Sequence, residues 1–285
     1  LAAIMVDLVP VPTSAQLTAP EITKMADQLS PALIVADHGV ALPLNPDIAV
    51  LDSTKLDAMH ALPPAKSVLC DPERPAYIVY TSGTAGVPRA VVHAHRAIWA
   101  RRMMWRDWYA ITPQDRLLHA GAFNWTYTLG TGLMDPWSVG ATALIAGPGF
   151  APGDLPALLA EHDVTIFAAA PGVYRQMLKN RPFGKMSLRH GLSAGEKLPP
   201  VTQRDWYAET GTKIYEAFGM SECSTFVSTS PDRPGNAETL GRPQRGRRAA
   251  ILGPDGPLPI GQAGTIAVSR RDPGLFLGYL DAPQE

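Results

Sequence analysis

One short segment combines glycine, hydroxyl side chains and a fixed positive charge. It reads Thr81-Ser-Gly-Thr-Ala-Gly-Val-Pro-Arg89 and follows an apolar run, Ala76–Tyr80, that predicts a buried strand. Glycine lets the backbone turn tightly, and backbone N–H groups in such turns bind anions. Arg89 has the fork geometry that suits phosphate. The composition therefore predicts a phosphate-binding loop, although a plain strand-to-helix turn uses the same residue types.

A second segment is typical of a nucleophile. Gly191-Leu-Ser-Ala-Gly195 matches the G-x-S-x-G turn of α/β-hydrolases, in which the general-base histidine follows the serine along the chain. All seven histidines precede Ser193. A hydrolase would need its base from outside these 285 residues, so the sequence disfavours that class.

Two histidines are spaced so that they could share one face of a strand. His93 and His95 form an H-x-H pair that could hold a metal. The spacing offers no third ligand, so a structural or solvent-facing role is favoured. Only two cysteines occur, Cys70 and Cys223, which excludes a disulfide framework and a four-cysteine zinc site.

The elements that must position these residues alternate along the chain. Strands are predicted at 32–36, 76–80, 116–119, 141–145, 164–168, 188–193 and 213–216. Helices are predicted at 18–29, 95–109, within 128–139, and at 155–162, 172–179 and 199–210. The proline-rich stretch 39–75 reads as a surface excursion. Such alternation predicts an α/β fold of mostly parallel sheets flanked by helices.

The composition of the sequence changes near Pro231. From there on, frequent glycine and proline residues separate short apolar runs, such as Ala249–Leu252 and Thr265–Val268. This pattern predicts a small antiparallel, β-barrel-like subdomain. We therefore predict an α/β part over residues 1–230 and a β-rich part over 231–285.

Composition sets the remaining bounds. Apolar residues make up 46% and charged residues 18% of the chain, which gives ample core and no signature of disorder. The net charge of −1 argues against a nucleic-acid face. No apolar run is long enough to span a bilayer, and no secretory signal is present, so we expect a cytoplasmic location. Both ends stop abruptly, at Leu1 and Glu285, as in a fragment.

The phosphate-loop candidate resembles the signature loop of the adenylate-forming superfamily. That loop commonly reads Y-T-S-G-T-T-G-x-P-K-G, and this chain differs at Ala85, Arg89 and Ala90. Ser193–Pro199 resembles the glycine loop of the adenine pocket, and Tyr215–Glu222 resembles the second nucleotide motif. Gly264–Val268 and Gly278-Tyr279 resemble the strands that close the large domain. These motifs occur in the order of the superfamily and extend over nearly the whole chain.

The resemblance implies roles for individual residues. It places ATP against Thr81, Ser82, Gly83, Thr84, Ala85, Gly86, Arg89, Ala194, Gly195, Glu196, Glu216, Ala217, Phe218, Gly219, Met220 and Ser221. It implies catalytic roles for Thr84, Arg89, Ser221 and Glu222. Glu222 falls on the Mg²⁺ ligand, a role that suits a carboxylate. Trp125 and Tyr127 would line or support the pocket for the carboxylate substrate, although core packing would explain Tyr127 equally well.

The function implied by the resemblance is that of an acyl-CoA synthetase, nearest to the acetyl, medium-chain or aryl acid–CoA ligases. Its substrates would be a small carboxylic acid, ATP and coenzyme A, with Mg²⁺, and it could form a homodimer. The basic clusters Arg101-Arg102 and Arg245–Arg248 would form a solvated face or contact the phosphates of coenzyme A. The superfamily's C-terminal lid, with its catalytic lysine, does not occur in these residues, so we expect a partial N-terminal domain with poor activity alone. Two alternatives stay open, a carrier-protein-loading adenylation domain and a degenerate nucleotide-binding relative.

Overall fold

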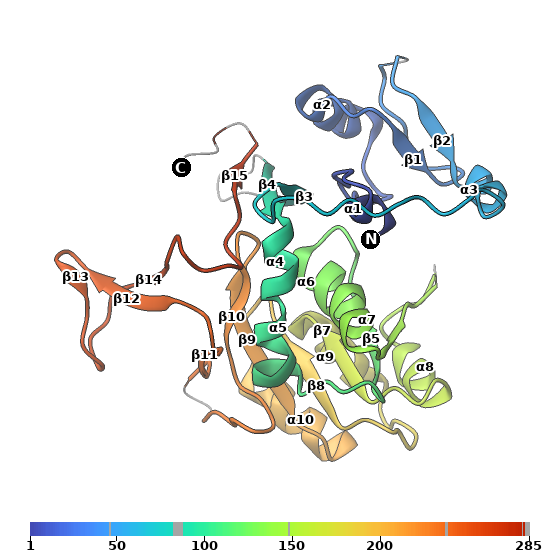
Figure 1. Cartoon of the computed structure of the whole chain (residues 1–285). Helices are drawn as coiled ribbons and strands as arrows, with labels where there is room; N and C mark the ends of the chain where they lie inside the picture. The colour runs from blue at the N-terminus through green and yellow to red at the C-terminus, as the bar shows by residue number, and fades with distance from the viewer. Residues whose placement is uncertain (46, 82–87, 148, 237–238, 281, 283–285) are drawn as a thin grey trace.

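The computed structural model describes residues 1–45, 47–81, 88–147, 149–236, 239–280 and 282 (Figure 1). Its largest sheet has seven strands in the order β11-β10-β9-β8-β7-β5-β6. Five of them run parallel: β5 Arg116–His119, β6 Thr142–Leu144, β7 Ile166–Ala169, β8 His190–Ser193 and β9 Ile214–Met220. Beyond β9, the strand β10 Ser224–Ser228 pairs antiparallel with β9, and the edge strand β11 Arg242–Pro243 pairs antiparallel with β10. The predicted α/β class is confirmed, with a mixed sheet.

Helices cover both faces of this sheet because its central strands are apolar on both sides. One face packs Phe167 of β7 against Tyr174 and Trp206. These two rings come from α9 Pro171–Met177 and α10 Pro200–Thr210, and α8 Leu155–Glu161 covers the same face. The other face packs Leu117 and Leu192 against Trp108. That ring belongs to a helical run formed by α4 His95–Ala100, α5 Arg102–Met104 and the π-helical turn Trp105–Tyr109.

A second helical run crosses the same side as α4. It consists of α6 Thr126–Leu129, a π-helical turn Gly130–Met134, and α7 Asp135–Val139. The strands predicted at 116–119 and 141–145 and the helices predicted at 95–109 and 128–139 correspond to these elements.

A separate three-stranded sheet, in the order β15-β4-β3, holds the base of the phosphate-loop candidate. β3 Pro75–Thr81 is antiparallel to β4 Arg89–Ala94, which pairs on its other side with β15 Gly278–Tyr279. The candidate loop therefore joins two antiparallel strands. The strand-to-helix alternative is wrong, because the six residues Arg89–Ala94 form β4 before α4 begins at His95.

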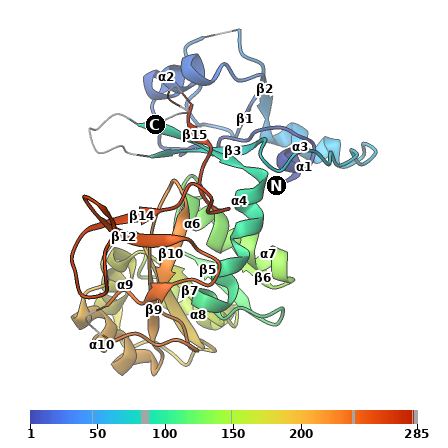
Figure 2. The same cartoon turned by 60° about the vertical axis from the view of Figure 1, so that its left-hand side comes forward.

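The first 60 residues form a small unit at the end of the molecule opposite α10 (Figures 1 and 2). It contains α1 Ala2–Met5, α2 Ala19–Leu29, α3 Ser53–Met59 and the parallel pair β1 Ile34–Ala36 and β2 Val50–Asp52. The apolar run 32–36, whose composition predicts a buried strand, forms β1 but is not buried, since Val35 is 54% exposed. The stretch 39–75, predicted to be a surface excursion, contains two short elements: β2 pairs with β1, and α3 follows β2 directly.

The C-terminal part contains β12 Ala249–Gly253, β13 Gly256–Pro257 and β14 Thr265–Val268. They form an antiparallel sheet in the order β13-β12-β14, which projects away from the seven-stranded sheet in Figure 1. The predicted antiparallel strands are confirmed. The boundary between residues 230 and 231 stays a prediction.

Candidate active site

A cavity of about 850 Å³ lies beside β9 and the loop that follows β8. This volume falls within the range of roughly 300–1,000 Å³ that is typical of small-molecule sites. Its lining residues are Gly195, Glu196, Lys197, Leu198, Pro200, Gln203, Arg204, Tyr207, Lys213, Ile214, Tyr215, Glu216, Ala217, Phe218, Gly219, Thr229, Pro234, Gly235, Asn236, Thr239 and Leu240. Two motifs predicted separately from the sequence, at 193–199 and 215–222, thus line one cavity.

The loop at the mouth of this cavity is shaped by one glycine and one carboxylate. Gly195 has φ +96°, which favours glycine and turns the chain from β8 toward α10. Glu216 of β9 accepts a hydrogen bond from the Leu198 N–H at 2.8 Å and ties the loop to the strand. Burial raises the pKa of Glu216, and the Leu198 N–H opposes that rise. Glu216 is therefore a structural link of the cavity wall.

The turn between β9 and β10 carries the predicted metal ligand. Met220 pairs with Ser224 across the turn, which leaves Ser221, Glu222 and Cys223 at its tip. Glu222 Oε1 accepts a hydrogen bond from Tyr279 Oη at 2.8 Å, and its backbone carbonyl accepts one from Phe276 N at 2.7 Å. The turn is thus tied to the chain just before and within β15.

Tyr279 also contacts the base of the phosphate-loop candidate. Arg89 lies opposite Thr81 in the β3–β4 register, and its Cζ lies 3.3 Å from the centre of the Tyr279 ring. One tyrosine therefore brings Arg89 and Glu222 together from elements 133 positions apart. The sequence pointed to Tyr279 only as part of a closing strand, and its role as a link between charged groups was missed. Ser82, Gly83, Thr84, Ala85 and Gly86 lie outside the described residues.

The donor set at this turn suits magnesium better than a metal held only by protein. Within the described residues, no group of three or more His, Cys, Asp or Glu side chains could hold an ion. Mg²⁺ commonly binds through one or two carboxylates together with substrate phosphates and water. The single carboxylate of Glu222, close to a phosphate-loop candidate, fits that pattern.

The histidine pair does not form a metal site. His93 lies in β4, stacked on Tyr77 with ring centres 4.7 Å apart, whereas His95 begins α4. Burial lowers the pKa of His93 to about 4, so its imidazole is neutral at pH 7. The structural role favoured by the sequence agrees with this packing.

The predicted acid-pocket residues lie in different surroundings. Trp125 precedes α6 and is 54% exposed. Tyr127 packs against Trp108 and His119, with ring centres 5.6 and 4.2 Å away, and donates to the Leu192 carbonyl at 3.2 Å. Neither is among the described residues that line the 850 Å³ cavity. The packing explains the position of Tyr127, and a substrate role for either residue stays a prediction.

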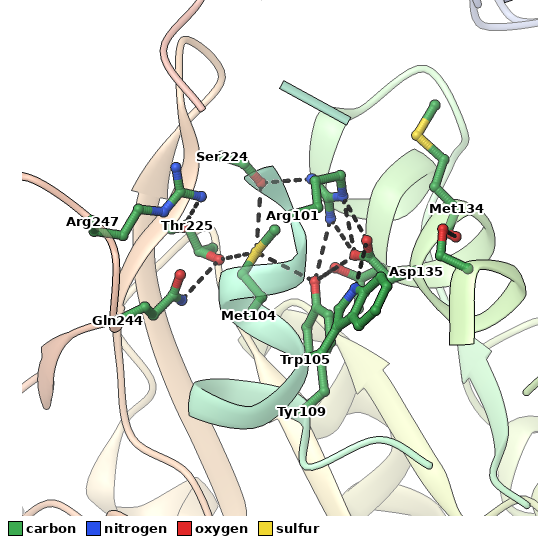
Figure 3. A network of polar contacts seen from close by, with 12 residues as sticks. Arg101, Met104, Trp105, Tyr109, Met134, Asp135, Ser224, Thr225, Gln244 and Arg247 are labelled. Atoms are coloured by element: carbon green, nitrogen blue, oxygen red, sulfur yellow. Dashed lines mark hydrogen bonds and ion pairs between the residues drawn. The ribbon is translucent and has the colours of Figure 1, made fainter. Parts of the chain in front are cut away.

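Three arginines of the basic clusters, Arg101, Arg245 and Arg247, form ion pairs, and Figure 3 shows the pair of Arg101 with Asp135. Arg101 is 2% exposed, and its Nη2 lies 2.6 Å from Asp135 Oδ2. Arg245 pairs with the buried Asp107, and Arg247 with Asp272 at 3.0 Å. A solvated face is therefore wrong for Arg101 and Arg247, because their buried acidic partners lie far away in sequence and composition does not reveal them. Burial equally argues against contacts from these two to coenzyme A.

The hydrolase alternative finds no support in the geometry. Ser193 ends β8 with no exposed surface, and its hydroxyl has no hydrogen-bond partner in the described part of the chain. His190, three residues earlier, is engaged with the Tyr109 carbonyl at 2.8 Å. A nucleophile elbow presents its serine to substrate, whereas Ser193 is buried in the protein.

Among the described residues, no helix is both long and apolar enough to cross a bilayer.

Comparison with known proteins shows which family the sequence matches. The family model described as AMP-binding enzyme matches residues 1–280. The human mitochondrial acyl-coenzyme A synthetase ACSM3 is 31% identical over 220 residues, which cover 73% of this chain and 37% of that protein. The 3-hydroxybenzoate–CoA ligase of Aromatoleum sp. (strain CIB) is 31% identical over 228 residues, covering 75% of this chain and 42% of the ligase. The chain thus spans about two fifths of the length of these relatives.

Solved structures share the fold. ATP-bound MatB from Rhodopseudomonas palustris superposes with a TM-score of 0.85 at 23% identity, covering 99% of this chain and 58% of MatB. A benzoate CoA ligase from Burkholderia xenovorans LB400 gives a TM-score of 0.82 at 24% identity, covering 97% and 58%. At these identities the likeness shows the architecture.

Proposed function

This chain belongs to the AMP-binding enzyme family, and we propose that it is the nucleotide-binding part of an ATP-dependent acid–CoA ligase. The observation that carries the proposal is that Gly195-Glu196 and Glu216–Gly219 line the same cavity. The strand that forms its wall continues, within three residues, into the turn with Glu222. The similarity to ACSM3 and to 3-hydroxybenzoate–CoA ligase supports an aliphatic or aromatic carboxylic acid as substrate.

In the proposed first step, a carboxylate oxygen of the acid attacks the α-phosphorus of ATP. The bond from that phosphorus to the bridging oxygen breaks, which gives acyl-AMP and pyrophosphate. In the second step, the thiol of coenzyme A attacks the acyl carbon and AMP leaves. No nucleophile from the protein is needed, so catalysis depends on positioning and on stabilising charge at the phosphates.

The residues of this chain take distinct parts in that scheme. The loop after β8 and the strand Glu216–Gly219 would bind the adenine, with Phe218 contributing an aromatic face. Arg89 would neutralise charge developing on the phosphates, and Ser221 would donate a hydrogen bond to them. Glu222 would hold Mg²⁺, which supplies charge neutralisation between phosphates when bound. The predicted contacts from residues 82–86 complete the proposal.

The test is acid-dependent release of pyrophosphate, followed by thioester formation with coenzyme A. Acetate, octanoate and benzoate span the acid classes suggested by the relatives. The assay is run on this chain and on the product of its complete gene. Release with one preferred acid and thioester formation support the ligase. Release without thioester formation on coenzyme A points to a carrier-loading enzyme, and no release with any acid, despite ATP binding, points to a non-catalytic nucleotide binder.

A further inference from the structure

A buried ion pair anchors the turn that carries Ser221 and Glu222 (Figure 3). The side chains of Arg101 and Asp135 are 3% and 2% exposed, with Nη2 and Oδ2 2.6 Å apart. Arg101 uses its remaining nitrogen, Nη1, to donate to Ser224 Oγ at 2.8 Å. Ser224 is the first residue of β10 and lies two positions beyond Glu222. One guanidinium group thus connects the start of α7 to the turn.

The surroundings leave this guanidinium group little freedom. Nε and Nη2 of Arg101 both donate to Asp135. Tyr109 Oη donates to the same carboxylate at 2.8 Å and lies 2.8 Å from Thr131 Oγ1. A Cβ at Gly130 would lie 2.5 Å from Arg101 Nε, so the backbone of the π-helical turn packs directly on the ion pair. The donor that reaches Ser224 is therefore held at a fixed place.

The backbone conformation of Ser224 is one that requires stabilisation by its surroundings. Its φ is +60°, in the left-handed region that non-glycine residues occupy when their surroundings stabilise it. On the facing strand, a side chain at Gly219 would collide with the Ser224 carbonyl, so the two strands approach closely here. The shape of the turn therefore depends on the conformation of Ser224.

Arg101 is also connected through the chain to the base of the phosphate-loop candidate. The strand β4 begins at Arg89 and leads through α4 to Arg101. The base of the candidate loop and the arginine that contacts the turn are thus parts of one continuous stretch, residues 89–101.

We propose that Arg101, fixed by Asp135, is a positioning residue that holds Ser224 in its left-handed conformation and thereby sets Glu222 and Ser221 against the metal and phosphates of bound nucleotide. The inference rests on the proposed function, in which Glu222 holds Mg²⁺. It goes beyond that function because it assigns the geometry of the turn to an ion pair whose side chains are buried.

Ser224→Gly separates positioning from stability. Glycine adopts a positive φ without strain, so the protein still folds, but without the link to Arg101 the backbone of residue 224 also samples other conformations. The measurement is the dissociation constant for ATP by calorimetry, with excess Mg²⁺ and with EDTA. A hydrogen bond to a charged group corresponds to about a tenfold effect, so we expect the gain in ATP affinity on adding Mg²⁺ to fall about tenfold. Affinity in EDTA stays within about twofold.

Two further variants control the comparison. Ser228→Ala removes a hydroxyl group from the other end of β10, where it donates a hydrogen bond of 2.7 Å to the Asp107 carbonyl. This variant should keep the wild-type gain in ATP affinity with Mg²⁺. Ser224→Asn offers a side-chain carbonyl to Arg101 and tolerates the left-handed region, so it should recover part of the gain lost in Ser224→Gly. This rescue is not expected from a residue that only fills space.

Two results would overturn the positioning role. In one, Ser224→Gly keeps the wild-type gain with Mg²⁺; in the other, it loses ATP affinity equally with Mg²⁺ and with EDTA. A wild-type chain that binds ATP with no response to Mg²⁺ instead overturns the metal role of Glu222 in the proposed function, and the positioning role with it. The wild-type titration thus distinguishes the two failures.

Discussion

Replacing Gly130 by alanine should destabilise this protein, because the added methyl group would clash with the guanidinium group of the buried ion pair. The new Cβ would lie 2.5 Å from Arg101 Nε and nearer still to its Cζ and Nη2. The arginine side chain cannot swing away, since it is 2% exposed and bound to Asp135 and Ser224. Either the π-helical turn shifts or the guanidinium group leaves its partner.

The size of the effect follows from these two routes. Overpacking a rigid interior costs about 1–3 kcal/mol. Separating a buried charge from its partner costs about 3–5 kcal/mol. Alanine gains about 0.5–1 kcal/mol over glycine in helical conformation. Over the two routes we therefore expect a net loss of about 1–4 kcal/mol, or a fall of roughly 2–15 °C in the apparent unfolding temperature.

The assay is thermal unfolding followed by circular dichroism, with Gly172→Ala as the matched control. A Cβ at Gly172, in α9, would meet Arg175 Nη2 at 3.8 Å, an ordinary contact. That variant should be as stable as the wild type or more stable by up to about 1 kcal/mol. If Gly130→Ala unfolds within about 2 °C of the wild type, the packing of residue 130 on Arg101 is not as described.

Three further changes test the site and its supports. Glu222→Ala should lower the rate of acid-dependent pyrophosphate release at least about tenfold at saturating Mg²⁺, and an unchanged rate would remove Glu222 from the metal role. Tyr279→Phe keeps the ring under Arg89 but removes the hydrogen bond to Glu222, so the Mg²⁺ concentration for half-maximal rate should rise about three- to tenfold with little change in the maximal rate. Burial opposes ionisation of Asp107, but Arg245 and Arg233 lower its pKa below the ordinary value of 3.8. Asp107 therefore stabilises the fold at neutral pH and loses this contribution as the pH falls through its lowered pKa, so denaturant titrations should show the deficit of Asp107→Asn shrinking below pH 3.8.

The alternation of apolar runs was enough to predict the parallel strands and their covering helices. Strand direction at the edges was not predictable in the same way. The turn Met220-Ser-Glu-Cys-Ser224 contains none of the Asn-Gly or Gly-Gly pairs that announce a hairpin, so β10 was missed and β9 was predicted too short. Likewise, β4 pairs with β15 almost 190 residues later, a contact that no local pattern encodes.

The resemblance to the adenylate-forming superfamily located two segments that line the cavity, because each of them is one short motif. It did not reveal the connections between segments. Tyr279 reaches Glu222 across 57 positions, and Arg101 reaches Asp135 across 34. Two adjacent arginines such as Arg101-Arg102 are expected to be solvated, because a charged side chain is rarely buried unless an opposite charge lies beside it. The partner is what changes the environment of Arg101, and the partner is distant in the chain.

The structure also narrows how the chemistry could proceed. Two side chains near the proposed site that carry nucleophilic atoms, Ser193 and Cys223, are buried. Ser193 is fully buried, and burial raises the pKa of the Cys223 thiol to about 12, so no thiolate forms at neutral pH. Both are poorly placed to attack a substrate. The proposed reaction, in which the acid's own carboxylate attacks phosphorus, requires neither of them. It would use the charged groups that Tyr279 contacts, the guanidinium group of Arg89 and the carboxylate of Glu222.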